Sequence, residues 1–488
     1  MTEIHIFGSQ SKLVDCPMHL VSAVDAVTSY PVAGAVYSKA FKKGHWDGRK
    51  RLLKKRGMAF PTGLVPAVQR ALQVAGEPVE VLDYRPVPEP AEAGFELSGV
   101  SFDHPYEYEL ETAEKMIKAK NGIIKIATNG GKTEIACAVT QYLGLYTLFV
   151  VTTRDLLYQG QERFMKRLQL TEEEVGIVGD GKWLPGSKVT IATVDTLESR
   201  INTTACQDLI KKAEVLFLDE CHHVGSETWY TVSTLCHAYY RFGMSGTPLD
   251  RTDGANLRLI AATGELLVDI GNKFLVDRGI SARAHIIFDK VVEPVLKKRI
   301  RYNTAYKQGV VENPHMLQKV LDWVKIFYKA GLGTLVLCEE IQHGRMIDDA
   351  LWTDVGEVFI PHQFIYGDED SDIRKKALAD FANGDLPVLV ASTILDEGVD
   401  VPTIDALVLA GSRKSRIRTM QRLGRGLRGK KLLVVDFANF TNKYLVEHSL
   451  QRLEDFKAEE CFPIYYSSPD VELVRKLWND EGTGVTTG

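Results

Sequence analysis

Residues 123–133 read Ile-Ile-Lys-Ile-Ala-Thr-Asn-Gly-Gly-Lys-Thr. A β-branched run leads into a glycine-rich turn, and Gly131-Lys132-Thr133 opens a stretch of helix-forming residues. Strand, loop and helix are the parts of a P-loop, whose backbone N–H groups and helix N-terminus attract polyphosphate. There, Lys132 would neutralise the β- and γ-phosphates and the Thr133 hydroxyl would bind Mg²⁺. Ile126 stands where the usual pattern begins with Gly, and alone the tripeptide could be a chance turn, so the rest of the chain decides.

The composition is ordinary for a soluble globular protein. The chain has 488 residues, 45% hydrophobic and 25% charged, which is enough for two or three domains. No apolar run is long enough to span a bilayer, and residues 1–12 lack the regions of a signal peptide, so we expect a cytoplasmic protein with no membrane partner. The seven cysteines form no C-x-x-C pair, which argues against a disulfide framework or a zinc site.

Positive charge is concentrated in two places although the net charge is −5. Lys42–Arg56 carries eight Lys and Arg against one acid, and Ala410–Lys431 carries nine against none. Such patches suit a polyanion partner, although a charge run can also be a solvated face. In the first patch, Asp47-Gly48 predicts a hairpin turn with Trp46 near its tip. Trp46 could pack on a base or sugar, or it could be a core residue.

The order of strand and helix signals predicts the domains. Residues 1–85 read as a small α/β domain with strands at 4–7 and 79–82 and helices at 20–28 and 64–75. Residues 86–100 contain Pro86, Pro88 and Pro90 and predict an extended linker. Two further α/β domains follow, residues 101–275 and 276–465, and residues 466–488 form a tail with a frayed end.

Alternating strands and helices in both larger domains predict parallel sheets with crossover helices. The strands expected in the first are 123–127, 148–151, 189–192, 215–218 and 242–244, and those in the second are 335–338, 364–366, 388–390, 406–409 and 432–435. Helices are expected at 154–168, 314–330 and 372–382.

Two acids end an apolar strand at Leu216–Glu220. At the carboxyl end of a parallel strand, Asp219 can reach the Mg²⁺ placed by Thr133, and Glu220 can act as general base on the attacking water. Paired acids at a strand end are also common without a function. The P-loop upstream favours the functional interpretation, and we reject a zinc site at His222 and His223 because no third ligand lies at a suitable spacing.

Residues 421–428 of the second large domain read Gln-Arg-Leu-Gly-Arg-Gly-Leu-Arg. On a helix, Arg422, Arg425 and Arg428 would lie near one face. Arg425 and Arg428 could complete a γ-phosphate site as arginine fingers, or the face could bind nucleic-acid backbone.

The order of these blocks resembles the superfamily 2 helicases of the DExH kind. The blocks similar to motifs I, Ia, Ib, II, III, IV, V and VI are 126–133, 152–154, 191–193, 219–222, 245–247, 335–338, 392–400 and 421–428. Within that superfamily the N-terminal block Gly44–Leu53 and Phe60–Leu64 is most similar to the phage UvsW-type helicases. The resemblance implies two tandem RecA-like domains behind a small DNA-binding domain, and ATP-driven unwinding and branch migration of forked and four-way DNA in recombination, repair and replication-fork rescue.

The resemblance also implies roles for individual residues. ATP would lie between the RecA-like domains, with Mg²⁺ bound by Thr133 and Asp219. The residues expected to bind the nucleotide are Tyr108, Glu109, Asn129, Gly130, Gly131, Lys132, Thr133, Gly398 and Asp400. Those expected to be catalytic are Lys132, Glu220, Gln421, Arg425 and Arg428, and those expected to couple hydrolysis to DNA are His222, Ser245 and Thr247. The expected DNA contacts are Lys42, Lys43, Trp46, Arg49, Lys50, Arg51, Arg154, Thr193 and Thr393.

Two residues depart from the family pattern. Asn129 stands where motif I has Gly, and because Asn tolerates left-handed backbone we predict a positive φ there. Glu109 stands where the family has Gln. Gln can both donate to and accept from adenine, whereas a carboxylate only accepts, so selectivity for adenine is less secure than hydrolysis.

We therefore expect a DNA-dependent ATPase that remodels branched DNA as a monomer, with other phage replication or recombination proteins as further candidate partners. An RNA helicase and a duplex translocase that does not separate strands remain open. A nucleotide-switched binding protein is disfavoured by the complete motif VI, and a metabolic P-loop kinase by the second domain. Polarity, the strand-separating element and the preferred DNA structure do not follow from the residues, although the family suggests 3′-to-5′ movement.

Overall fold

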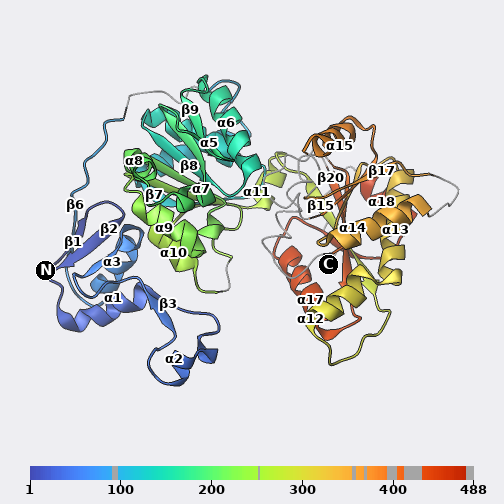
Figure 1. Cartoon of the computed structure of the whole chain (residues 1–488), viewed down its shortest axis with the longest axis horizontal. Helices are drawn as coiled ribbons and strands as arrows, with labels where there is room; N and C mark the ends of the chain where they lie inside the picture. The colour runs from blue at the N-terminus through green and yellow to red at the C-terminus, as the bar shows by residue number, and fades with distance from the viewer. Residues whose placement is uncertain are drawn as a thin grey trace. The chain divides into compact units, whose positions relative to one another are not determined.

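The chain folds into α/β units whose larger sheets are mainly parallel (Figure 1). The computed structural model describes residues 1–90, 97–250, 253–353, 359–367, 371–392, 404–411 and 431–479. Contacts divide the chain into unit 1, Met1–Ala127 with Gly131–Gly271, and unit 2, Thr128–Gly130 with Asn272–Gly488. The division after Gly271 lies close to the boundary expected at residue 275. Among the described residues, no helix has both the length and the apolar character needed to cross a bilayer.

The first 85 residues of unit 1 form a small α/β fold, as the sequence predicts. Its four-stranded sheet has the order β5 (Ala59–Pro61), β2 (Gln10–Val14), β1 (Thr2–Ile6), β6 (Val79–Asp83). β1 is antiparallel to β2 and parallel to β6. Helices α1 (Val21–Val27) and α3 (Val65–Val74) bury their apolar residues in one core with the strands.

A separate two-stranded ribbon carries the first basic patch, and here the predicted hairpin turn is wrong. β3 (Ser29–Pro31) pairs antiparallel with β4 (Arg49–Arg51). Residues 32–48 join them through the 3-10 turn Ala35–Tyr37 and the short helix α2 (Lys39–Lys42). Asp47-Gly48 therefore lies at the end of a long connection and not at a two-residue tip. Gly48 has φ +78°, and a Cβ there would lie 3.1 Å from the Phe41 ring, which explains the glycine without a tight hairpin.

The large sheet of unit 1 has eight strands, seven of them parallel. Its order is β10 (Lys182–Leu184), β9 (Val175–Gly179), β11 (Val189–Thr193), β8 (Thr147–Val151), β12 (Val215–Asp219), β13 (Tyr240–Ser245), β7 (Asn121–Ile126), β14 (Leu266–Ile270). Only β10 is antiparallel to its neighbour. All five predicted strands are present. The sequence analysis missed β9, β10 and β14.

Helices cover this sheet and connect its strands. They are α4 (Glu107–Ala119), α5 (Lys132–Leu143), α6 (Arg154–Leu168), α7 (Val194–Ser199), α8 (Thr204–Lys212), α9 (Glu227–Leu235) and α10 (Asn256–Thr263). The bounds of α6 are those predicted. The central strands are buried along their whole length, as expected of a parallel sheet covered on both faces.

Helix α10 joins the small N-terminal fold to the large sheet of unit 1. Its Ala261 belongs to the N-terminal core, and Leu257 and Ile260 pack against that core. The backbones approach so closely that a Cβ on Gly63 would lie 2.0 Å from the carbonyl oxygen of Ile260. Ser9 Oγ also donates a 2.6 Å hydrogen bond to the carbonyl of Thr234. The small fold is therefore fixed to the first large sheet.

Unit 2 is built on a seven-stranded, fully parallel sheet. Its order is β17 (His362–Ile365), β18 (Val388–Ala391), β16 (Thr334–Leu337), β19 (Ala406–Leu409), β20 (Lys431–Asn439), β15 (Arg283–Val291), β21 (Ile464–Tyr466). Its helices are α11 (Asn272–Asp277), α12 (Tyr302–Tyr306), α13 (Pro314–Lys329), α14 (Ile341–Thr353), α15 (Ser371–Asn383), α17 (Lys443–Lys457) and α18 (Val471–Asn479).

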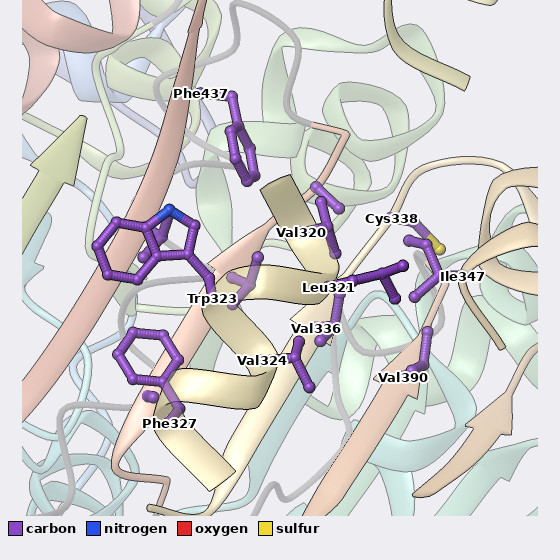
Figure 2. Packing of buried hydrophobic residues seen from close by; sticks show 14 of the residues in the cluster. Val320, Leu321, Trp323, Val324, Phe327, Val336, Cys338, Ile347, Val390 and Phe437 are labelled. Carbon is purple, nitrogen blue, oxygen red and sulfur yellow. The ribbon is translucent and has the colours of Figure 1, made fainter. Parts of the chain in front are cut away.

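Alternate residues of these strands enter two cores on opposite faces of the sheet. On one face α13 contributes Val320, Trp323 and Phe327 against Val336 and Phe437 of the strands (Figure 2). On the other face, residues of β16, β18 and β19 meet α15 and Phe456 of α17.

The sequence analysis missed β15 and β21 and assigned residues 466–488 to a tail. Residues 471–479 instead form α18, whose Val474 and Leu477 are buried in the first of these cores.

Candidate functional site

The P-loop connects β7 to α5, as predicted. Gly131 caps the helix in left-handed conformation with φ +73°, and α5 begins at Lys132. Asn129 has φ +70°, which confirms the left-handed backbone predicted for it. The Lys132 ammonium donates a 3.2 Å hydrogen bond to the carbonyl of Ile126 and so lies folded back over the loop. A lysine and a helix N-terminus that meet in one loop suit a polyphosphate.

Asp219 and Glu220 lie at the carboxyl edge of the same sheet, where β12 ends. Glu220 has φ +46°, an uncommon conformation for this residue type that turns the chain sharply after the strand. Burial, and then the adjacent Glu220 charge, raise the pKa of Asp219 to about 7, while Lys132 acts to lower it. Because Lys132 acts on the pKa of both carboxyl groups, the structure brings the predicted lysine and acids together.

The predicted coupling residues form one hydrogen-bonded network with Glu220. Ser245 Oγ, at the end of β13, donates a 3.1 Å bond to Glu220 Oε2 and accepts one from the Thr247 backbone N–H. His222 Nδ1 lies 3.1 Å from Ser245 Oγ and 3.4 Å from Glu220 Oε2. Since Ser245 uses its proton on Glu220, this arrangement favours a proton on Nδ1 of His222.

This network sets the charge of Glu220. Burial alone would raise its pKa, but the bond from His222, the charges of Lys132 and His222, and the Ser245 hydroxyl outweigh burial and hold the pKa at about 2. Glu220 is therefore ionised at neutral pH and able to accept a proton, whereas burial and the adjacent Glu220 charge disfavour the ionised form of Asp219.

Glu109 contacts the P-loop from α4. Tyr108 and Glu109 are both 4% exposed, and a Cβ built on Gly131 would lie 1.9 Å from Glu109 Oε1. Burial, followed by the charge of Glu134, raises the pKa of Glu109 to about 8, and Arg167 acts in the opposite direction. The residue that departs from the family pattern is thus in direct contact with the loop.

The predicted DNA contacts of the basic patch differ in their surroundings. Lys42 and Lys43 are exposed at the end of α2. The other four have partners within the chain, which sequence reasoning did not reveal. Trp46 Nε1 donates to the carbonyl of Arg49, Arg49 bonds Ser29, Lys50 pairs with Glu227, and Arg51 pairs with Asp25 and Asp47.

Two further expected contacts lie at the carboxyl edge of the large sheet of unit 1. Arg154 begins α6, is exposed and pairs with Asp180 at 3.1 Å. Thr193 ends β11 and bonds Thr196 through its hydroxyl at 2.8 Å. The remaining predicted residues lie outside the described part of the chain: Thr393, Gly398, Asp400, Gln421, Arg425 and Arg428.

Arg258 is a residue that sequence reasoning missed. It is 6% exposed in α10 and donates to the carbonyl of Gly225 at 2.8 Å and to Glu227 at 2.6 Å. Because Glu227 also binds Lys50, this pair of contacts links the basic ribbon to the turn that follows Glu220. An arginine within the otherwise apolar run Leu257–Ala262 was the signal available in the sequence.

Two family models match the chain. The model for the type III restriction enzyme res subunit matches residues 103–250, and that for the helicase conserved C-terminal domain matches residues 315–430. These matches contain the P-loop, the acidic pair and the arginine block of the second domain.

Individual proteins are also similar. The DNA 3′-5′ translocase XPB2 of Sulfurisphaera tokodaii is 27% identical over 66% of this chain and 78% of its own. The ATP-dependent DNA helicase uvsW of Enterobacteria phage T4 is 22% identical over 94% of this chain and 97% of its own. Among solved structures, the DUF1998 helicase MrfA bound to DNA has a TM-score of 0.55 at 15% identity and covers 80% of this chain and 55% of its own. At that identity the last likeness concerns the fold, and it confirms the two predicted RecA-like sheets.

Proposed function

We propose that this chain, which belongs to the superfamily 2 helicases, is an ATP-driven motor that moves on DNA and unwinds and branch-migrates forked and four-way junctions. One observation supports it most. Lys132 of the P-loop and the paired acids Asp219 and Glu220 meet at the carboxyl edge of one parallel sheet. This is the arrangement that nucleoside triphosphate hydrolysis needs.

The residues at this edge suit Mg²⁺ and a nucleotide. Hard oxygen donors are what Mg²⁺ prefers, and Asp219 with the Thr133 hydroxyl would hold it, where it would neutralise phosphate charge. Asp219 fits this role because a cation at its carboxylate would offset the burial and the Glu220 charge that otherwise disfavour its ionised form. The left-handed loop of Asn129 and Gly131 would direct backbone N–H groups to the phosphates.

The side chains then have separate tasks. Glu220, ionised and fixed by Ser245 and His222, accepts the proton of the attacking water. Lys132 stabilises the charge on the β- and γ-phosphates. Gln421, Arg425 and Arg428, with Gly398 and Asp400, are assigned by the sequence to the ATPase residues of the second RecA-like domain.

DNA is proposed as the track on three grounds. The similar proteins include a DNA translocase and a phage DNA helicase. The exposed Lys42 and Lys43 can contact phosphates directly. Arg49, Lys50 and Arg51 lie on the ribbon that Glu227 and Arg258 link to the catalytic turn, so a contact there can influence hydrolysis. Arg154, Thr193 and Thr393 complete the proposed track.

The first test is Lys132→Ala, with Lys125→Ala on the preceding strand as the matched control. We expect Lys132→Ala to abolish ATP hydrolysis and unwinding while DNA binding stays measurable, and Lys125→Ala to keep all three activities. Full hydrolysis by Lys132→Ala would contradict the assignment of the site.

The second test concerns the substrate. ATPase rates with a four-way junction, a simple fork, linear duplex and single-stranded RNA separate branch migration from the alternatives. We expect the junction and the fork to stimulate most and the junction to be unwound. Stimulation of the ATPase by linear duplex without unwinding would indicate a duplex translocase. If RNA stimulates most, the protein is an RNA helicase. A single turnover that does not respond to DNA would indicate a nucleotide-switched binding protein. Trp46→Ala in the same assays tests the ribbon.

A further inference from the structure

A pocket in unit 2 is lined by residues that belong to none of the blocks similar to helicase motifs. It has a volume of about 390 Å³ and is lined by the carboxyl ends of β15 and β20, by the end of β21 with the residues that follow it, and by Ser449, Leu450 and Leu453 of α17. Ligand sites in proteins commonly have volumes of about 300–1,000 Å³. The pocket is therefore large enough for one planar group.

The register of the strands explains the composition of the pocket. Phe288 of β15 lies opposite Tyr466 of β21, and Lys290 lies opposite Ala438 of β20. Since side chains alternate along a strand, Phe288 and Lys290 share one face, together with Tyr466 and Phe440. Aromatic rings and a lysine are thus grouped on one corner of the sheet.

These aromatic side chains remain accessible. Tyr466 is 68% and Phe440 44% exposed, whereas Phe288 is buried and forms the floor, with its ring 6.3 Å from that of Tyr466. Leu450 of α17, 52% exposed, forms the wall. Exposed aromatic faces around one pocket are unusual on a surface that meets only water.

The charge of the pocket indicates its ligand. Lys290 Nζ lies 5.3 Å from the centre of the Phe440 ring, and Ser467 and Ser468 add hydroxyl groups. Among the described residues that line the pocket there is no carboxylate. Aromatic faces beside one cation fit a base with its attached phosphate, since stacking is available to every base and the cation attracts the backbone.

The position in the sheet is consistent with such a ligand. All seven strands are parallel, so the pocket lies at the same edge of the sheet as the end of β16, which carries motif IV, and the end of β18, after which motif V begins. Motif V is the proposed backbone contact of unit 2.

We propose that this pocket binds one base of single-stranded DNA, stacked on Tyr466 and Phe440 with Lys290 at its phosphate. This inference rests on the proposed function because it takes DNA as the ligand. It adds a stacking site to a track that the motifs describe only as backbone contacts.

The test measures affinity of the whole chain for a fluorescent single strand and for a strand of equal length with abasic sites. We expect Tyr466→Ala and Phe440→Ala each to weaken binding of the normal strand on the order of 10-fold, as for loss of a stacked base. Binding of the abasic strand should be equal in these variants and in the wild type. Tyr466→Phe should restore affinity, and Phe359→Ala, which removes a ring elsewhere in unit 2 whose exposure lies between those of Phe440 and Tyr466, should have no effect.

Salt dependence tests the lysine. Lys290→Gln should reduce the slope of log affinity against log salt by about 0.7, the value for one phosphate of a single strand, while Lys329→Gln leaves the slope unchanged. If the wild type binds DNA and the Tyr466 and Phe440 variants bind it equally well, the proposed base-stacking site is wrong and a protein partner at this pocket is favoured. A wild type that binds no DNA overturns the proposed function as well.

Discussion

The carboxylate of Glu109 lies directly against the backbone of Gly131, so that a methyl group on Gly131 would fall 1.9 Å from Oε1. Through this contact, helix α4 packs directly against the P-loop. Gly131 has φ +73°, so its backbone conformation favours glycine, and any larger residue would also have to displace the Glu109 carboxylate.

Gly131→Ala should be more destabilising than left-handed strain alone, because the added Cβ must also displace the buried carboxylate of Glu109. Gly331→Ala is the matched control, since Gly331 has φ +72° and no atom within 4 Å of the added Cβ. We expect the control to cost about 1 kcal/mol and Gly131→Ala about 1–3 kcal/mol more, measured by denaturant unfolding. In a Glu109→Ala background the excess should shrink. Equal costs at the two glycines would contradict the contact.

Glu109→Gln should change how stability depends on pH. The pKa of Glu109 is raised to about 8 by burial and then by Glu134, with Arg167 opposing, whereas the unfolded value is near 4.5. Between these values the folded state holds a proton that the unfolded state has lost, so wild-type stability falls as pH rises.

The Gln variant lacks this loss and should be more stable than the wild type above pH 8, by on the order of 2–4 kcal/mol. The advantage should disappear near pH 4.5. Thermal unfolding between pH 4.5 and 9 measures it, with Glu114→Gln on the exposed side of α4 as the control. A constant difference across this range would show that Glu109 titrates normally.

Ser245→Ala should lower kcat for ATP hydrolysis about 10-fold with little change in KM. The variant removes a hydrogen bond to the charged Glu220 and the partner of His222, a loss of about 1.5 kcal/mol that acts on the base and not on nucleotide binding. Steady-state ATPase assays separate the two constants. Ser233→Ala, a buried serine of α9 whose hydroxyl bonds the carbonyl of Tyr230, is the control. An altered KM at constant kcat would place Ser245 in binding instead.

Arg258→Met should lower the stability of unit 1 by about 2–4 kcal/mol, because it leaves the buried carbonyl of Gly225 without its donor and removes the ion pair with Glu227. Lys50→Met removes the exposed partner of the same glutamate and should cost less than about 1 kcal/mol. Urea unfolding curves, monitored by tryptophan fluorescence, compare the stabilities of the two variants. Similar losses of stability in both variants would show that the buried Arg258 contributes no more to stability than the exposed Lys50.

Local patterns predicted most of the regular structure. The strands that contain residues 215–218 and 406–409 are continuous apolar runs there, and residues 123–126 are interrupted only by Lys125, which is how a parallel strand covered on both faces is encoded. The strands that were missed depend on neighbours distant in the sequence. β21 has three residues, and β15 contains only the short apolar run Ile286–Phe288 between polar residues. Pairing with β20 makes β15 a strand of nine residues.

The candidate site was predicted where chemistry resides in contiguous motifs and missed where it depends on tertiary contacts. The sequence motifs identify Lys132, Asp219, Glu220, His222 and Ser245. Neither the contact of Glu109 with Gly131 nor that of Arg258 with Glu227 has a signature in spacing, because each joins segments that the fold alone brings together. The hairpin turn predicted at Asp47-Gly48 is wrong for the same reason, since a local turn signal does not identify which strands pair.

The shared core beneath Gly63 and Ala261 bears on how such a motor can evolve and be engineered. A domain that recombines freely between proteins must bury its apolar residues within itself. The N-terminal fold does not, because part of its core is supplied by helix α10. It cannot be exchanged as an independent cassette, and a truncation that begins after residue 96 would leave the apolar side of α10 open to aggregation. Inheritance of the N-terminal fold is therefore tied to inheritance of the large sheet and helix α10 of unit 1.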